Sequence, residues 1–314
     1  MDIRHVAVAG TGMMGPGIAA TFALVGCRAT IVSRTAEGAA GGVAKARSLI
    51  ETLSANGLAD AGQAKDAVTR LAPSTDPEAA VRAAQLFVES IPEDLPAKQA
   101  FFARLDKVSP DVILCSNTSG ISITAIASKS TRRQRILTTH FWNPPHLMPL
   151  VEVAVSEWTT PQIAEEVMRL LRTCGKLPVL VRKDRPGQLG NRIQHAMIRE
   201  CVNIVQEGIA TAEDVDLAVK TGVGLRLPVY GVFEHADMVG LDLVKAVQDY
   251  VLPDLSTVPH AGELHQEKVA KGDLGVKTGR GFLEWTPAKA QEIRARRDAF
   301  LIQFLRWQKA GTFS

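Results

Sequence analysis

The 314-residue chain has few aromatic side chains and lacks a long apolar run. Phe, Trp and Tyr together make up 5% of the residues, and Tyr occurs only twice. No stretch of 18 or more consecutive apolar residues occurs, which argues against a membrane-spanning helix. A strand pattern begins at Ile3 without a basic and apolar leader before it. We therefore expect a cytoplasmic protein that does not bind a membrane.

Cysteine is also scarce. Cys27, Cys115, Cys174 and Cys201 stand far apart, with no C-x-x-C pair and no neighbouring His at metal-ligand spacing. We expect four reduced packing residues and no metal site.

The charges nearly cancel. Lys and Arg (36) exceed Asp and Glu (33) by only +3, which is too small a bias for a nucleic-acid-binding protein. A content of 46% apolar and 22% charged residues is typical of a folded globular protein, and this length suggests about two domains. The partner is therefore expected to be a small molecule recognised by local sites.

Residues 287–309 form one locally basic segment with a charge of +4, from six cations and two acids. A membrane or nucleic-acid surface is one interpretation of it. The alternative is an ordinary packed helix with a solvated basic face, and its apolar spacing favours this. That stripe consists of Ile293, Phe300, Leu301, Phe304 and Leu305.

In the first half, short apolar runs alternate with amphipathic stretches, which is typical of a parallel sheet with crossover helices. A long helical insertion over 36–70, broken near residues 55–58, predicts a hairpin. The fold class is thus α/β, a Rossmann-type doubly wound sheet followed by an all-helical domain. The expected strands are 6–9, 29–33, 86–90, 112–116, 136–140, 150–155 and 178–181.

After the Arg185-Pro186-Gly187 segment the pattern becomes helical, so we predict domains over 1–185 and 186–314. The first helix of the second domain carries an apolar stripe, predicted to be buried, that ends at Gly208. The stripe consists of Ile193, Met197, Ile198, Cys201, Val202 and Val205. Further helices are expected over 212–220, 241–251, 260–271 and 287–309.

A glycine-rich motif follows the first strand. In Gly10-Thr11-Gly12-Met13-Met14-Gly15, the first glycine permits a tight turn, the second lets a pyrophosphate approach the backbone, and the third lets the next helix pack closely. The phosphates would lie on that helix's N-terminal amides. The motif predicts a dinucleotide cofactor, with Met13 and Met14 in its site. The alternative is a turn without a ligand.

The second strand ends in Ser33 and Arg34 where an acid usually binds the ribose hydroxyls. A hydroxyl and a guanidinium suit a 2′-phosphate, so the sequence favours NADP over NAD. Arg34 could instead stack on the adenine of either cofactor.

Polar residues gather near the carboxyl ends of later strands, where open α/β sheets place their chemistry. His140 precedes Phe141-Trp142-Asn143-Pro144-Pro145, and Glu152 projects from the next strand. This arrangement predicts a general base, His140, whose second nitrogen is held by Glu152.

The motifs S-N-T-S (116–119), H-F-x-N-P (140–144) and L-V-E-V (150–153) resemble those of the L-3-hydroxyacyl-CoA dehydrogenase family, and the resemblance covers nearly the whole chain. It implies His140 as catalytic base, Glu152 as its orienting partner, Ser119 as hydrogen-bond donor to the substrate oxygen and Asn191 as a second polarising group. Taken singly, Ser119 and Asn191 are typical turn or capping residues. His195 shares the helix face of Asn191 and receives no role.

The resemblance also makes Glu93, Lys98 and Asn143 cofactor contacts, with Lys277 a further candidate, and we place Asn117 of the S-N-T-S motif in the same site. It implies a homodimer formed through the helical domain. The predicted activity is that of an NAD(P)-dependent 3-hydroxyacyl-CoA dehydrogenase-like oxidoreductase, which moves a hydride between a secondary 3-hydroxyl or 3-keto group and the nicotinamide.

Three departures leave the substrate open: Gly120 replaces a common serine, Gln188 stands where an aromatic is usual, and Arg226 brings a cation to a usually apolar run. At a bend after 222–224, Arg226 would face the cleft and pair with a substrate carboxylate, or it is an ordinary surface arginine. A small CoA-free hydroxy acid or alcohol is thus the alternative substrate. A non-catalytic dinucleotide-binding protein of crystallin type is the alternative of another class, and the intact His140 and Glu152 argue against it.

Overall fold

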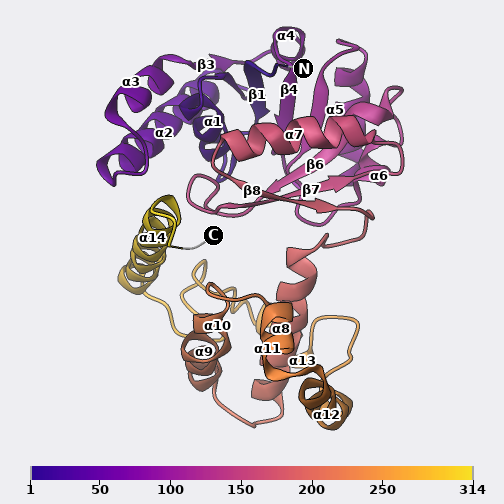
Figure 1. The fold of residues 1–314 in the computed structure, drawn as a ribbon, viewed down its shortest axis with the longest axis vertical. Coiled ribbons are helices and arrows are strands. Elements are labelled where there is room, and N and C mark those ends of the chain that lie inside the picture. Colours follow the sequence, from indigo (N-terminus) through magenta and orange to yellow (C-terminus); the bar gives the residue numbers. More distant parts are fainter. Residues whose placement is uncertain (1, 313–314) are drawn as a thin grey trace. The chain divides into compact units, whose positions relative to one another are not determined.

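The computed structural model describes residues 2–312, which contain one eight-stranded sheet (Figure 1). The strand order is β3-β2-β1-β4-β5-β6-β7-β8, and all neighbours are parallel except the antiparallel pair β6 and β7. The strands are β1 (His5–Ala9), β2 (Arg28–Val32), β3 (Leu71–Ser74), β4 (Leu86–Glu89), β5 (Ile113–Ser116), β6 (Ile136–Phe141), β7 (Leu150–Val155) and β8 (Leu177–Val181).

Helices cover both faces of this sheet, because alternate strand residues point to opposite faces. Val6 and Val8 of β1 join one core with α1 (Gly15–Leu24), α2 (Ala36–Ala55), α3 (Ala61–Thr69) and α7 (Pro161–Thr173). Ala7 and Ala9 join the opposite core with α4 (Pro77–Ala83), α5 (Leu95–Asp106) and α6 (Ile123–Ala127). A short 3-10 turn, η1 (Arg133–Arg135), leads into β6.

The remaining elements are helical. They are α8 (Gly190–Gln206), α9 (Ala212–Thr221), α10 (Val223–Arg226), α11 (Val232–Val239), α12 (Leu241–Val251), η2 (Leu252–Asp254), α13 (Glu263–Ala270) and α14 (Pro287–Lys309). Residues 2–192 and 300–312 form one compact unit, and residues 193–299 form a second. The predicted division into domains over 1–185 and 186–314 stays a prediction. Among the described residues, no helix is long and apolar enough to cross a membrane.

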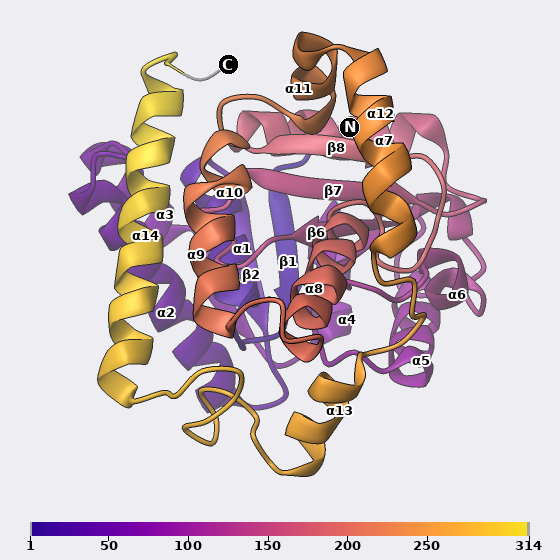
Figure 2. The same cartoon turned by 90° about the horizontal axis from the view of Figure 1, so that it is seen from below.

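The predicted fold class is confirmed, and so is the helical hairpin, which α2 and α3 form. The prediction of a parallel sheet is wrong at β7. Only eight residues separate β6 from β7, too few for the crossover that a parallel pair needs, so β7 runs antiparallel. Figure 2 shows β7 beside β8, its parallel partner. The edge strand β3 was not predicted, because Leu-Ala-Pro-Ser has no β-branched residue and contains a proline.

Two predicted apolar stripes are less buried than expected. On α8, Ile193 is 61% exposed, and only Val202 is buried among the helix's described residues. The other stripe residues of α8 line a cavity of about 710 Å³ within the second unit instead of a closed core. On α14, Phe300 is 52% exposed and the rest of the stripe is half-buried. Helices α10 and α11 were not predicted.

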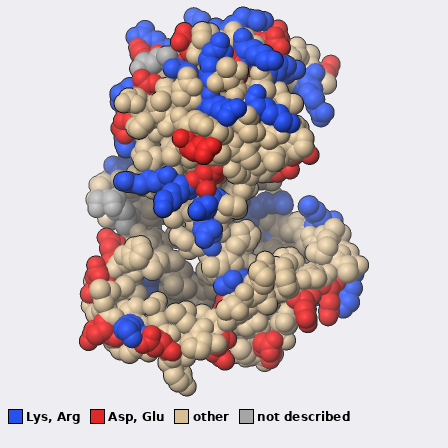
Figure 3. All heavy atoms as spheres, turned by 90° about the vertical axis from the view of Figure 1, so that its right-hand side faces the viewer, with Lys and Arg blue, Asp and Glu red and all other residues tan. Residues whose placement is uncertain are grey.

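The four cysteines are free thiols, two of them buried and two half-buried, as expected for reduced packing residues. The face drawn in Figure 3 carries both basic and acidic side chains, in keeping with the small net charge.

Candidate active site

The glycine-rich motif lines a cleft of about 1140 Å³ in the first unit. Gly10 has φ +115°, and a Cβ there would lie 2.3 Å from the Ser90 carbonyl oxygen. A Cβ on Gly15 would lie 1.9 Å from the Gly10 oxygen, whereas a Cβ on Gly12 would meet no atom within 4 Å. The turn therefore requires its outer glycines, and the bare backbone at Gly12 leaves room for a phosphate at the start of α1. These residues fit the pyrophosphate of a dinucleotide.

The cleft brings together most of the predicted site. Its lining includes Gly10, Gly12, Met13, Met14, Ser33, Arg34, Glu93, Lys98, Asn117, Ser119, His140 and Asn143. Ser33 and Arg34 follow β2 directly, and no carboxylate stands between them and α2, which begins after the N-cap Thr35. Arg34 is exposed, so its guanidinium is free to meet either an adenine or a 2′-phosphate.

His140 and Glu152 meet because β6 and β7 pair antiparallel in a register that sets these two residues opposite each other. His140 Nδ1 lies 2.7 Å from Glu152 Oε2. Since an ionised carboxylate only accepts hydrogen bonds, Nδ1 is the protonated nitrogen in this pair. His140 also lines the cleft, so Nε2 is the ring nitrogen left for a substrate proton.

The fully buried Glu152 carboxylate is held by four donors. Besides His140, the Trp142 Nε1–H donates to Oε2 at 3.0 Å, and the Leu189 and Gly190 amides at the start of α8 donate to Oε1 at 2.8 Å each. Burial by itself would raise the pKa of this carboxyl, but the four hydrogen bonds outweigh burial and lower its pKa to about 2. Glu152 is therefore an anion throughout the neutral range.

Ser119 belongs to a second polar network. Glu93 accepts hydrogen bonds from the Ser119 amide at 2.8 Å, the Ser119 hydroxyl at 3.3 Å and the Thr118 hydroxyl at 2.9 Å. Burial opposes ionisation of Glu93, but these donors and the Lys98 ammonium outweigh it and keep the pKa of the carboxyl below its ordinary value. The network fixes Ser119 at the cleft.

Lys98 is 1% exposed and lies between two carboxylates. Its ammonium donates to Glu89 at 2.6 Å and to the Ile91 carbonyl at 3.3 Å, and it lies 3.2 Å from Glu93. These three acceptors match its three protons. The predicted contact of Lys98 with the cofactor would thus have to replace one of them.

The predicted asparagines differ in their partners. Asn117 Oδ1 accepts from the Phe141 amide at 2.9 Å, which ties β5 to the end of β6. Asn143 is exposed in the cleft lining. Asn191 Nδ2 donates to the Ser119 carbonyl at 2.8 Å, so in this structure its amide contacts the backbone of Ser119. Its role as a second polarising group stays a prediction.

Two predicted residues lie in the second unit. Arg226 is an exposed residue at the end of α10, and Lys277 lines the cavity of about 710 Å³. The predicted bend does occur, because Gly222 ends α9 and precedes α10. The roles of both side chains stay predictions.

Sequence reasoning missed three contributors to the site. Glu89 accepts hydrogen bonds from Lys98 and from the Ser116 hydroxyl at 2.7 Å, and nothing in the sequence distinguishes it from an ordinary strand residue. Trp142 lies inside the His140 motif, so its position in the sequence could have identified it as a residue of the site. The α8 amides on Glu152 are backbone groups, which sequence patterns do not reveal.

Comparison with known proteins shows to which family the chain belongs. Residues 5–185 match the model of the 3-hydroxyacyl-CoA dehydrogenase NAD-binding domain, and residues 187–285 match the C-terminal domain of the same family. A Mesorhizobium japonicum relative, 5-formyl-3-hydroxy-2-methylpyridine 4-carboxylate 5-dehydrogenase, is 34% identical over 307 residues, covering 96% of each chain.

Solved structures agree. That of a 5-formyl-3-hydroxy-2-methylpyridine 4-carboxylic acid 5-dehydrogenase, described as an NAD+-dependent dismutase, has a TM-score of 0.90 and 32% identity, covering 98% of this chain and 99% of its own. The (S)-3-hydroxybutyryl-CoA dehydrogenase of Ralstonia eutropha has a TM-score of 0.76 and 33% identity, covering 91% of this chain and 100% of its own. The family model and the first of these structures name NAD, and neither supports a preference for NADP. The chain belongs to the 3-hydroxyacyl-CoA dehydrogenase family of NAD-dependent oxidoreductases.

Proposed function

We propose that the protein oxidises the hydroxyl group of a small CoA-free substrate, or reduces the corresponding carbonyl, with His140 as the general base or acid. The observation that supports this chemistry is the 2.7 Å contact between His140 Nδ1 and Glu152 Oε2. His140 also lines the cleft that the cofactor would occupy. When bound, the nicotinamide would accept the hydride in the oxidation direction.

In the oxidation direction, His140 Nε2 removes the hydroxyl proton, and the anionic Glu152 stabilises the charge that the imidazole gains. The Ser119 hydroxyl donates to the substrate oxygen as that oxygen gains alkoxide character. To do so it exchanges its long 3.3 Å contact with Glu93 for the substrate. Asn191 holds the Ser119 backbone through the Ser119 carbonyl.

The choice of a CoA-free substrate rests on the α2–α3 hairpin, where we expect the cations that a CoA substrate would need for its phosphates. Two of its four cations are already engaged: Lys45 donates to the Gly12 carbonyl at 3.3 Å, and Arg70 donates to the Ala23 carbonyl and pairs with Asp66. Only Arg47 and Lys65 remain without such contacts, both of them exposed. Two solvated cations are a weak site for a molecule with several phosphate charges.

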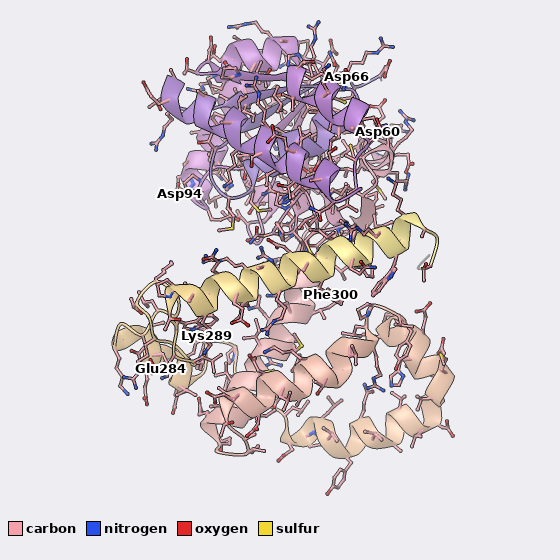
Figure 4. The ribbon with its side chains drawn as sticks, turned by 90° about the vertical axis from the view of Figure 1, so that its left-hand side faces the viewer. Asp60, Asp66, Asp94, Glu284, Lys289 and Phe300 are labelled. Atoms are coloured by element: carbon pink, nitrogen blue, oxygen red, sulfur yellow. The ribbon has the colours of Figure 1, made fainter. Side chains whose placement is uncertain are left out.

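Helix α14 adds to this argument. Its residues 300–309 belong to the same compact unit as the hairpin, beside which the helix ends (Figure 4). Arg306 Nε donates to the Asn56 carbonyl at 2.9 Å, and Lys309 Nζ donates to the Gly57 carbonyl at 3.3 Å, both in the turn between α2 and α3. The family models end at residue 285, and the pyridine carboxylate dehydrogenase structure covers more of this chain than the hydroxybutyryl-CoA enzyme does. These observations favour the CoA-free branch over a hydroxyacyl-CoA.

A matched substrate panel tests this proposal. Each compound is supplied as free 3-hydroxy acid and as its CoA thioester, together with hydroxymethylpyridine carboxylates, and NADH formation is followed by absorbance. We expect turnover of a free acid or a pyridine alcohol, with thioesters at least tenfold poorer in kcat/KM. Preferred turnover of the thioesters would refute the CoA-free proposal. Absence of turnover with the whole panel would favour the non-catalytic, crystallin-type alternative.

The cofactor site supports a finer proposal, that NADP is accepted at least as well as NAD. The support is the absence of a carboxylate at the end of β2 and the exposed Arg34 in the cleft lining. Isothermal titration with both cofactors measures the preference directly.

We also propose that the protein is a cytoplasmic homodimer joined through the helical unit. The support for the dimer is that large apolar side chains of that unit are exposed, among them Phe233 at 84%, Met238 at 77% and Leu241 at 63%. Apolar patches of this kind commonly mark interfaces between subunits. Light scattering after gel filtration should give the mass of two chains, and a monomer at micromolar concentration would contradict the proposal.

A further inference from the structure

Trp142 is the side chain at the one position that the H-F-x-N-P motif leaves open. Its indole Nε1–H donates to Glu152 Oε2 at 3.0 Å, and its ring centroid lies 5.5 Å from that of His140 at an angle of 44°. The same ring lies against the start of α8, because a Cβ built on Gly190 would be 2.4 Å from Trp142 Cζ2. Trp142 therefore lies against Glu152 and against two of the groups that hold it, His140 and the start of α8.

The two donors share one oxygen. Glu152 Oε2 accepts from both His140 Nδ1 and Trp142 Nε1, whereas Oε1 accepts from the two α8 amides. A carboxylate oxygen that serves two donors offers each of them less negative charge than it would offer one alone. It also has less freedom to rotate about its last torsion, since every oxygen is held on two sides.

We propose that Trp142 is a positioning residue for the reaction. Its indole N–H fixes the Glu152 carboxylate in the plane that His140 needs, and it limits the charge that Oε2 presents to the imidazole. The inference rests on the proposed role of His140 as the base. Trp142 itself is not among the residues that line the cleft.

Three other ionisable groups, Glu93, Lys98 and Lys176, have partners other than Trp142. Glu93 and Lys98 belong to the separate network around Ser119 and line the same cleft. Lys176, which precedes β8, is buried, and its ammonium donates to the Pro145 and Met148 carbonyls at 2.6 and 2.8 Å. Burial lowers the pKa of Lys176 to about 8.

The test removes the donor in two ways. Trp142→Phe removes the N–H and half of the ring system, whereas site-specific incorporation of 3-benzothienylalanine at position 142 keeps both rings and replaces the N–H by sulfur. The first readout is the low-field proton NMR signal of His140 Nδ1–H in the free enzyme, identified by its loss in His140→Asn. We expect this signal to move downfield in both variants, because Oε2 then serves one donor only.

The second readout separates positioning from damage to the fold. With the best substrate of the panel, kcat should fall about tenfold in both variants, which is less than the 10²-fold that a 1 Å misplacement can cost. The Kd for the preferred cofactor should stay unchanged. Trp158→Phe is the matched control, because Trp158 stacks on Arg133 at 4.5 Å and does not line the cleft. It should leave both readouts unchanged.

An unshifted Nδ1 proton signal in the benzothienylalanine variant would overturn the inference, even if Trp142→Phe fails to fold. A shifted signal in a protein that turns over no compound of the panel would show that Trp142 adjusts the His140–Glu152 hydrogen bond, but it would refute the proposed function and with it a role of Trp142 in the reaction. The NMR signal and the substrate panel therefore distinguish a failure of the Trp142 inference from a failure of the proposed function.

Discussion

Glu152→Gln replaces the carboxylate that joins β6, β7 and the start of α8. A glutamine keeps one carbonyl oxygen for the Leu189 and Gly190 amides, but it must then point its amino group at His140 Nδ1 and Trp142 Nε1, which are themselves donors in the wild type. At least one buried donor loses its acceptor. We expect a less stable protein in which His140 is poorly oriented.

The magnitude follows from the pKa of the carboxyl. A fall from the ordinary 4.5 to about 2 in the folded state corresponds to about 3 kcal/mol of stability at pH 7. Because the folded pKa is the lower one, this contribution is complete above the unfolded value and is lost as the pH falls towards the folded value. By about pH 3.5 roughly 1 kcal/mol of it should be gone. Glutamine does not titrate, so the variant lacks this part of the pH dependence.

Urea unfolding followed by circular dichroism at pH 7 and about pH 3.5 tests the reasoning. The difference in unfolding midpoint between wild type and Glu152→Gln should be largest at pH 7 and should shrink at the lower pH. Glu165→Gln is the control, because Glu165 is an exposed acid of α7, and its effect should be small at both pH values. A difference between wild type and Glu152→Gln that stays constant with pH would show that Glu152 is not stabilised as an anion.

Three further predictions concern the reaction. His140→Asn should lower kcat by about 10²- to 10⁴-fold while the cofactor Kd stays near wild type, and near-normal turnover would rule out His140 as the base. Ser33→Asp should shift binding from NADP towards NAD in calorimetric titrations, because a carboxylate repels a 2′-phosphate; a wild type that binds NAD more than tenfold tighter than NADP would show that Arg34 does not recognise the phosphate. Arg226→Met should raise KM about tenfold for the best free acid and change thioester kinetics little, whereas unchanged kinetics would make Arg226 a surface residue.

Local patterns in the sequence determined the cofactor end of the site. A buried strand, three glycines at fixed spacing and a helix are contiguous in the chain, so their geometry follows from neighbours, and Gly10 and Gly15 stand where no other residue fits. The pairing of His140 with Glu152 was also predicted, but the antiparallel return of β7 that produces it was not. The eight residues between the two strands are too few for the crossover of a parallel pair, so that return could have been inferred from the sequence.

Tertiary structure alone decided how these groups are held. Glu152 depends on the amides of Leu189 and Gly190, and Lys98 is surrounded by Glu89, Glu93 and the Ile91 carbonyl. Every residue type except proline has a backbone N–H, so the sequence does not show which amides bind a carboxylate. The sequence also does not show whether a charged residue is buried, because burial depends on partners that are distant in the chain. The apolar stripe on α8 was predicted to be buried, but most of it lines a cavity. Periodicity shows that a helix has an apolar face, but whether that face meets a closed core or an open cavity depends on elements distant in the sequence.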